Sequence, residues 1–190
     1  AIPFATRLTQ GCAALPGRYK VTAGERNIIA TIDGRPALEV YREAIGPALA
    51  ANLRLAAQTV LVGLPTGDDR TDDYLARNIV GIDPRAGMIA IGAEVEPGMS
   101  IRFCRRDASS ARLDLERMLD ELVRELDRPA RAALYFSCLA RGAHMFGADS
   151  VEIGLVRERL GAIPIAGFFA NGEISRDRLY AYTGVLTVFA

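Results

Sequence analysis

Two short apolar runs near the end of the chain constrain the fold more than any other feature. Residues 132–138 and 163–169 are each long enough for one buried strand, and residues 150–160 between them have the pattern of a helix that Gly161 ends. The connection is long enough to join two parallel strands, and such crossovers are almost always right-handed. We therefore expect one parallel β-α-β crossover near the C-terminus.

The loops that follow these two runs hold most of the polar residues of this region. If both runs are parallel strands, the loops emerge at the same carboxyl edge of the sheet, where open α/β sheets bind their ligands. Glycines in both loops would let backbone N–H groups approach a ligand closely. The sequence thus predicts a small-ligand pocket at this edge, lined by Ser137, Cys138, Arg141, Gly142, Phe169, Asn171, Gly172 and Glu173.

Arg141 and Glu173 are the charged members of this loop pair, and their side chains can act in two ways. The Arg141 guanidinium can form two parallel hydrogen bonds to a ligand carboxylate, while the Glu173 carboxylate accepts from a ligand ammonium. Together they would complement an amino acid zwitterion. Alternatively, the two side chains form a salt bridge that fastens the loops together, and both interpretations are compatible with the sequence.

Cys138 raises an enzymatic alternative, a thiol-dependent hydrolase or transferase. In that case Cys138 would be the nucleophile and His144 its base, while Glu173 or Asn171 would orient the imidazole. A cysteine that ends an apolar strand is more often an inert buried side chain, so we expect no enzymatic activity. A third alternative is a ligand-free interaction module whose loops are purely structural.

The rest of the chain predicts an α+β fold in one domain, with a largely antiparallel mixed sheet and packed helices. Residues 109–126 carry apolar side chains at the three-and-four spacing of a helix face. Turn residues separate short β-prone segments, which predicts an antiparallel meander, and a last strand is expected at the sheet edge. The expected strands of the meander are residues 59–64, 74–82, 87–91 and 99–104, and the last strand is 180–189.

The N-terminal quarter of the chain gives a weaker signal. Residues 1–25 contain glycine and proline with little periodicity and are expected to be an extended lead-in to a domain of residues 26–190. After the β-prone segment that ends at Ile32, Asp33-Gly34 predicts a turn. The residues that follow could return as a second strand, but 36–45 are good helix formers after a proline, and we favour a helix there.

Composition excludes several classes of function. Basic and acidic residues balance at 23 each, and no basic cluster or long apolar run is present, so neither nucleic acid nor membrane is an expected partner. Three scattered cysteines and one histidine predict a reducing cytoplasm and give no metal-ligand pair. No cofactor is expected, and the acidic run 68–73 is interpreted as a solvated turn rather than a metal loop.

Four phrases of the sequence resemble the C-terminal half of FIST domains. Two of them surround the predicted loops: LYFSCLARG at 134–142 and LGAIPIAGFFANGEI at 160–174. TQGC at 9–12, with Val21 and Thr22, is similar to the junction that follows the N-terminal half of the family. IDGRPALEVY at 32–41 is similar to the start of the C-terminal half.

This resemblance implies a sensory rather than an enzymatic role. FIST domains are intracellular sensory domains of bacterial signalling proteins and of eukaryotic F-box proteins, with amino acids or related metabolites as their proposed ligands. The family usually carries a longer N-terminal half, so residues 1–25 are expected to be the tail of such a half. The resemblance implies that the protein partner is this N-terminal half or a signalling output domain.

Overall fold

The computed structural model describes residues 2–67, 74–148 and 151–190, apart from the side chain of His144. The acidic run 68–73 therefore lies outside the described residues. The chain forms two compact units, of which unit 1 comprises Ala1–Ala13 with Asp107–Ala190, and unit 2 comprises Ala14–Arg106. The buried apolar side chains correspondingly gather into two separate cores, one in each unit.

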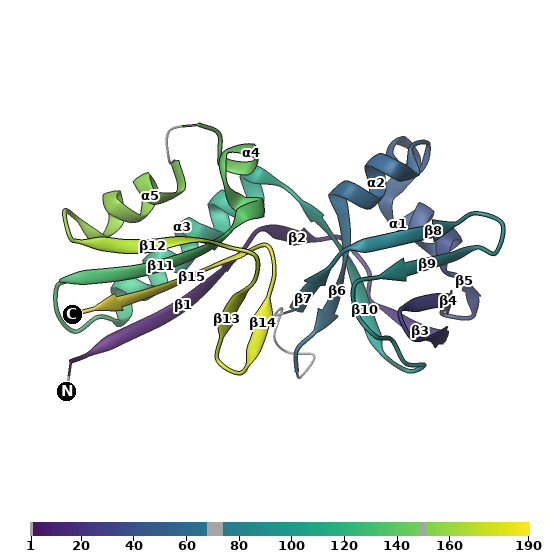
Figure 1. Cartoon of the computed structure of the whole chain (residues 1–190), viewed down its shortest axis with the longest axis horizontal. Coiled ribbons are helices and arrows are strands. Elements are labelled where there is room, and N and C mark those ends of the chain that lie inside the picture. Colours follow the sequence, from purple (N-terminus) through teal and green to yellow (C-terminus); the bar gives the residue numbers. More distant parts are fainter. Residues whose placement is uncertain (1, 68–73, 149–150) are drawn as a thin grey trace. The chain divides into compact units, whose positions relative to one another are not determined.

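Unit 1 is built on a four-stranded sheet in the order β1-β15-β11-β12 (Figure 1). β1 (Phe4–Gln10) pairs antiparallel with β15 (Thr183–Phe189), and β15 pairs antiparallel with β11 (Ala132–Cys138). β11 and β12 (Ile165–Ala170) are parallel and are joined through α5 (Val151–Leu160). The predicted parallel crossover and the α+β fold class are therefore confirmed.

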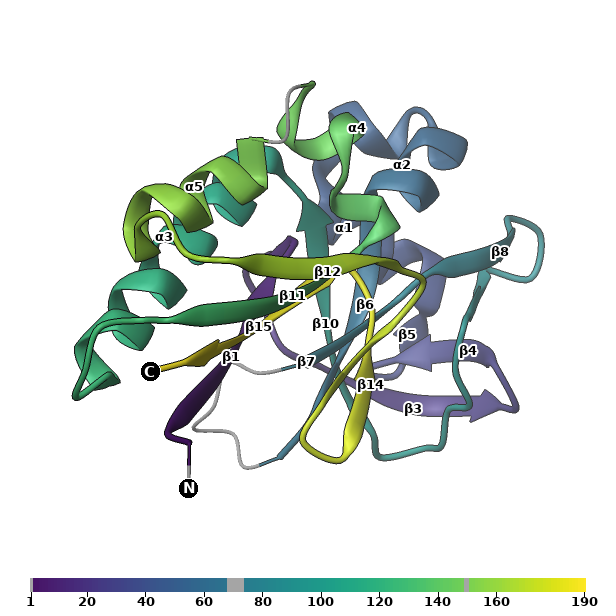
Figure 2. The same cartoon turned by 60° about the vertical axis from the view of Figure 1, so that its left-hand side comes forward.

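Two helices of unit 1 lie on the same face of this sheet (Figures 1 and 2). α3 (Ala108–Glu125) begins at Asp107, whose side chain accepts a hydrogen bond from the Ser110 N–H at 2.8 Å. Its apolar face packs with α5 and the sheet into one core. The buried residues that α3 contributes to this core are Leu115, Met118, Leu119 and Leu122.

The termini of the chain meet in the sheet of unit 1, which corrects two expectations. β15 was expected at the sheet edge, but it is central because β1 pairs with its free side, from Phe4 opposite Phe189 to Gln10 opposite Thr183. Residues 1–25 were expected to be a lead-in, yet they supply β1 and two further strands, Cys12–Ala14 and Tyr19–Glu25. The pairing of β1 with β15 has no local signal, because it joins the two ends of the chain, whereas the strand at Tyr19–Glu25 pairs with the next strand along the chain, Ile28–Ile32.

Unit 2 contains a larger sheet in the order β7-β6-β10-β3-β4-β9-β8, with β5 paired to β4. Insertion of β10 between β6 and β3 means that the predicted segments do not form a simple meander. The chain leaves unit 1 through β2 (Cys12–Ala14). The other strands are β3 (Tyr19–Glu25), β4 (Ile28–Ile32), β5 (Arg35–Pro36), β6 (Val60–Pro65), β7 (Tyr74–Arg77), β8 (Ile79–Asp83), β9 (Met88–Ile91) and β10 (Ser100–Arg106).

Helices α1 (Ala37–Ala50) and α2 (Leu53–Thr59) complete unit 2. The helix favoured at 36–45 is confirmed, since α1 starts directly after Pro36. Gly46 interrupts α1 with a φ of 78°, a conformation that favours glycine, and Pro47 follows it. The core of this unit contains buried residues from β3, β4, β6, β9, β10 and both helices.

Substitution in the core of unit 1 is expected to show how much α3 contributes to stability. Leu119→Ala should lower the free energy of unfolding by about 2–5 kcal/mol, because a side chain that is 1% exposed leaves a cavity. Leu113→Ala on the same helix is the control, since Leu113 is 66% exposed and should change little. Urea unfolding followed by circular dichroism measures both, and equal losses would contradict the assigned helix face.

Candidate functional site

The parallel pairing of β11 and β12 brings the two predicted loops together. Cys138 at the end of β11 lies opposite Ala170 at the end of β12, so both loops start at the same edge of the sheet. β11 continues into a 3-10 turn, η1 (Leu139–Arg141), and then α4 (Ala143–Phe146). A Cβ atom added at Gly142 would lie 3.8 Å from the ring of Phe169, which shows that the loops touch.

A buried ion pair lies just behind this edge. Arg141 is 0% exposed, and its Nη2 lies 2.7 Å from Oε1 of Glu152 in the first turn of α5. The Arg141 Nε donates to the same oxygen at 2.8 Å. A buried charge is strongly unfavourable unless it is paired, so each of these two side chains depends on the other.

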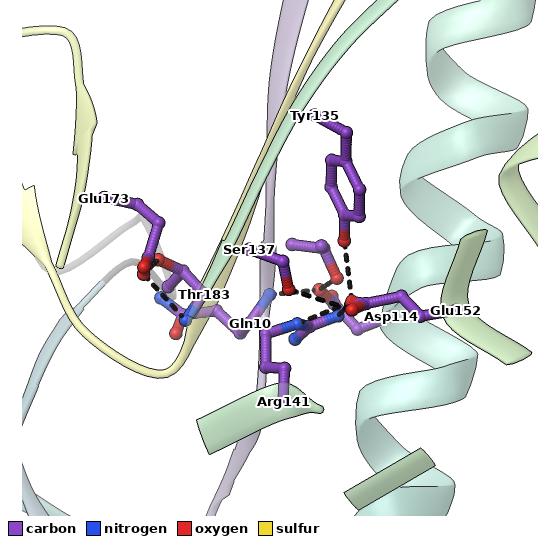
Figure 3. A network of polar contacts seen from close by, with 9 residues as sticks. Gln10, Asp114, Tyr135, Ser137, Arg141, Glu152, Glu173 and Thr183 are labelled. Carbon is purple, nitrogen blue, oxygen red and sulfur yellow. Dashed lines mark hydrogen bonds and ion pairs between the residues drawn. The ribbon is translucent and has the colours of Figure 1, made fainter. Parts of the chain in front are cut away.

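Two hydroxyl groups of β11 complete the hydrogen bonding of the Glu152 carboxylate (Figure 3). The Tyr135 hydroxyl donates to Oε1 at 2.6 Å, and the Ser137 hydroxyl donates to Oε2 at 2.8 Å. Burial raises the pKa of Tyr135, so its hydroxyl stays protonated and able to donate. Gly184 on β15 leaves room for that hydroxyl, since a Cβ there would lie 2.3 Å from it.

The rest of the Arg141 guanidinium is enclosed by apolar atoms and backbone. Its central carbon lies 5.1 Å from the centroid of the Phe146 ring, a cation–π contact. Nη1 is buried and has no hydrogen-bond partner in the part of the chain that the structure describes. A Cβ at Gly11 would lie 3.3 Å from this nitrogen and 2.3 Å from the carbonyl oxygen of Tyr182, so only glycine fits there.

Glu173 forms a second buried carboxylate centre, at the start of the hairpin of β13 (Glu173–Ser175) and β14 (Arg178–Tyr180). Its Oε2 accepts from the Thr183 hydroxyl at 2.8 Å, and its Oε1 accepts from the Gly172 N–H at 3.3 Å. Burial raises the pKa of Glu173 above its ordinary value of 4.5, although these hydrogen bonds and the charge of Arg141 act in the opposite direction.

Asp114 links α3 to β1, the strand at the edge of the sheet opposite β12. Its Oδ2 accepts from the Thr9 hydroxyl at 2.9 Å and from the Gln10 N–H at 2.6 Å. Its Oδ1 pairs with Arg117 of the same helix. Figure 3 shows this carboxylate close to the Arg141 and Glu152 cluster. Polar side chains from β1, α3, β11 and α5 therefore gather in one region of unit 1.

A cavity of about 280 Å³ opens beside this polar cluster, between α5 and the strands β11 and β12. Its polar lining is the Glu152 carboxylate with the hydroxyls of Tyr135 and Ser137. The remaining lining is apolar and comes from Ile153 of α5 and from β12. Residues that β12 contributes are Ile165, Ala166, Gly167, Phe168 and Phe169. Such a mixture, mostly apolar with few polar groups, is typical of small-ligand sites.

The structure places the predicted site residues in different environments. Ser137 and Phe169 line the cavity. Arg141 and Glu173 do not pair with each other: the ion pair of Arg141 is with Glu152, so the salt bridge considered from the sequence is wrong. The others lie around the same edge, with Cys138 buried, Asn171 exposed, and Gly142 and Gly172 half-buried.

Glu152 and Tyr135 are the residues of this site that the sequence interpretation missed. Glu152 is charged and occurs in a helix, which is ordinarily a sign of a solvated position. The available signal was its spacing: Glu152 and Val156 are four apart, which places both on one helix face, and both are buried. Tyr135 was predicted only as part of the apolar strand 132–138, with no role in the site.

The thiol chemistry considered for Cys138 receives little support from its surroundings. Cys138 is a buried thiol, 4% exposed, outside any disulfide. The side chain of His144, its expected base, lies outside the described part of the structure. Glu173, one of the two residues expected to orient that base, instead accepts hydrogen bonds from Thr183 and Gly172.

Comparison with known proteins identifies relatives over nearly the whole chain. The family model described as the FIST C domain matches residues 37–176. Uncharacterized protein Rv0628c of Mycobacterium tuberculosis is 32% identical over 190 residues, which are 96% of this chain and 50% of that protein. Uncharacterized protein Mb0898c of Mycobacterium bovis is also 32% identical, over 96% of this chain and 49% of that protein.

The chain spans about half the length of these curated relatives. No solved structure matches it. Within the described residues, none of the helices combines the length and the apolar character that crossing a membrane requires.

Removing the Glu152 carboxylate is expected to be strongly destabilising. Glu152→Ala should lower the free energy of unfolding by about 3–5 kcal/mol, because it leaves the Arg141 charge buried without a partner. Glu158→Ala, on the exposed side of the same helix, is the matched control and should change stability by less than about 0.5 kcal/mol. If urea unfolding gives similar values for the two variants, the buried pair does not hold α5 to the sheet.

Glu173 is expected to make stability depend on pH. Its pKa is higher in the folded chain than in the unfolded chain, so the folded state keeps a proton that the unfolded state releases. The contribution is therefore fully present below the ordinary pKa of 4.5 and is lost as pH rises through the folded pKa. Stability of the native chain relative to Glu173→Gln should fall as pH increases over this window.

Urea unfolding of both proteins at a series of pH values measures this difference. Glu158→Gln serves as the control for the loss of an exposed carboxylate. A stability difference between the native chain and Glu173→Gln that stays constant, or that grows in favour of the native chain as pH rises, would contradict the raised pKa of Glu173.

Proposed function

The chain belongs to the FIST C domain family, a family of sensory domains, and we propose that it binds a small metabolite as the ligand-binding part of a signalling protein. The observation that carries this proposal is the cavity of about 280 Å³ whose inner wall holds the hydrogen-bonded Glu152 carboxylate. Its volume lies near the lower end of the range of about 300 to 1,000 Å³ typical of small-molecule sites. A single metabolite fits this size.

The lining of the cavity favours an amino acid as the ligand. Phe168, Phe169 and Ile165 offer an apolar surface for the body of such a molecule. Glu152 and the Ser137 hydroxyl offer acceptors for an ammonium group. Because Arg141 already balances the charge of Glu152, a zwitterion with no net charge would leave no unbalanced charge at the site.

The role of Arg141 in ligand binding differs from the one expected from the sequence. As a buried partner of Glu152, Arg141 would hold the carboxylate in place rather than contact the ligand itself. Glu173, with Cys138, Gly142, Asn171 and Gly172, would shape the edge beside the cavity. In this proposal the contacts to the ligand come from Ser137, Glu152 and Phe169.

Ligand binding would be transmitted to a partner domain through α5 and β11, which the hydrogen bonds of Glu152 connect. Glu152 lies on α5, and its hydroxyl donors lie on β11, so a ligand ammonium that competes for the carboxylate would change how α5 is held against the sheet. The receiver would be the N-terminal FIST half or a signalling output domain, in the cytoplasm of a bacterium. We propose no catalytic step, since Cys138 is buried and is not among the residues that line the cavity.

A thermal shift panel of the standard amino acids and their decarboxylated amines tests this proposal. We expect at least one compound to raise the Tm of the chain, because binding to the folded state stabilises it. With that compound, Ser137→Ala and Phe169→Ala should each weaken binding by about tenfold, measured by calorimetry. These changes remove one polar and one apolar contact of the cavity.

Two matched substitutions outside the cavity are the controls. Ser109→Ala and Leu113→Ala alter exposed positions of α3 and should leave binding unchanged. The proposal fails if no compound of the panel raises the Tm, or if Phe169→Ala binds as tightly as the native chain.

A further inference from the structure

The connection from β12 to β13 consists of only two residues, Asn171 and Gly172 (Figure 1). Gly172 has a φ of 130°, a conformation that favours glycine. A Cβ atom at this position would also lie 3.0 Å from the Leu179 side chain, so a larger residue would need that side chain to give way. The fold therefore requires a glycine directly after an exposed asparagine.

An asparagine that precedes a glycine is chemically labile. The backbone nitrogen of the following residue can attack the side-chain amide carbon, and a glycine hinders this attack least because it has no Cβ. The chain has four asparagines, and the other three are followed by the branched residues Ile28, Leu53 and Ile79. Branched side chains hinder the attack. Asn171 is thus the asparagine of this chain whose sequence context favours the reaction.

The side chain of Asn171 is also free to take up the geometry of this attack. It is exposed, and its amide makes no hydrogen bond to any residue that the structure describes. By contrast, the Asn27 amide donates to the Ile91 carbonyl at 3.2 Å, and the Asn52 amide oxygen accepts from the Leu55 N–H at 3.1 Å. Those bonds hold two of the other amides in place, whereas the Asn171 amide carbon can rotate toward the next backbone nitrogen.

The Glu173 carboxylate lies beside the nitrogen that would attack. The Gly172 N–H donates to its Oε1 at 3.3 Å, and a carboxylate within this reach can accept the proton that the nitrogen must lose. The Thr183 hydroxyl orients the carboxylate by donating to Oε2 at 2.8 Å, and Arg141 is the charged group whose field acts on it. Burial raises the pKa of Glu173, which makes it a stronger base than an exposed carboxylate.

We propose that Asn171 is a self-modification site at which the side-chain amide is lost, with Glu173 as the base. The Gly172 nitrogen forms a bond to Cγ of Asn171 while its proton passes to Glu173. The Cγ–Nδ2 bond breaks, and the amide nitrogen takes up that proton and leaves as ammonia, so a cyclic succinimide remains. Water then opens the ring at either carbonyl and gives aspartate or isoaspartate. The chain thereby gains a carboxylate two residues after Phe169, which lines the cavity.

Incubation of the native chain at neutral pH, followed by digestion in acid and peptide mass spectrometry, tests the proposal. Conversion of amide to acid at Asn171 should be faster than at Asn27, Asn52 and Asn78 by about tenfold or more, because attack by a glycine nitrogen meets a lower barrier. Hydroxylamine, which attacks a succinimide, should cleave the chain between Asn171 and Gly172. Equal conversion at all four asparagines would overturn the proposal.

Two further measurements test the base. Glu173→Gln should slow conversion at Asn171 by about tenfold or more, whereas Glu158→Gln, at an exposed position of α5, should convert at the native rate. A pH series on the native chain serves if Glu173→Gln unfolds: once Glu173 is ionised, the rate should change little with pH, whereas hydroxide as the base would raise it in proportion to its concentration. The proposal fails if the native rate rises in that proportion throughout, or if folded Glu173→Gln converts as fast as the native chain.

Discussion

Glu152 places a largely buried carboxylate against the wall of the cavity, and the arrangement of unit 1 around the cavity depends on how that charge is satisfied. Arg141 supplies the opposite charge, and Tyr135 and Ser137 supply hydroxyl donors. These partners come from η1 and β11, so one carboxylate joins the crossover helix to the strand and loop that precede it. Loss of any partner would leave a polar group unpaired in an apolar surrounding.

The same arrangement leaves space for a ligand beside the carboxylate. α5 is held at its first turn by Glu152, while β12 offers mostly small or exposed side chains toward the helix, and the cavity lies between them. A polar group that is already fixed by its partners binds a ligand without further ordering, which is the usual basis of preorganised sites. Sensing then requires only that the ligand compete with one of those partners.

The face of the unit 1 sheet away from α3 and α5 differs in character from the face that carries the cavity. Leu8, Phe136 and Phe168 form part of a sheet surface with neither charges nor a covering helix. The cavity lies on the helix-covered side of the sheet, whereas Phe168 of the edge strand β12 makes an edge-to-face contact with Phe136 on the opposite side and is also among the residues that line the cavity.

The sequence by itself determined the elements, because hydrophobic spacing and turn residues act locally: the crossover of β11, α5 and β12, and the helices α1 and α3. It also placed Ser137 and Phe169 at one edge, since parallel strands share a direction. Tertiary structure alone decided the rest. The pairing of β1 with β15 and the division into two units join residues distant in the chain, for which local pattern gives no distance. Arg141 and Glu152 are only 11 residues apart, but they meet because α5 packs back on the strand that precedes it, which the spacing alone does not give.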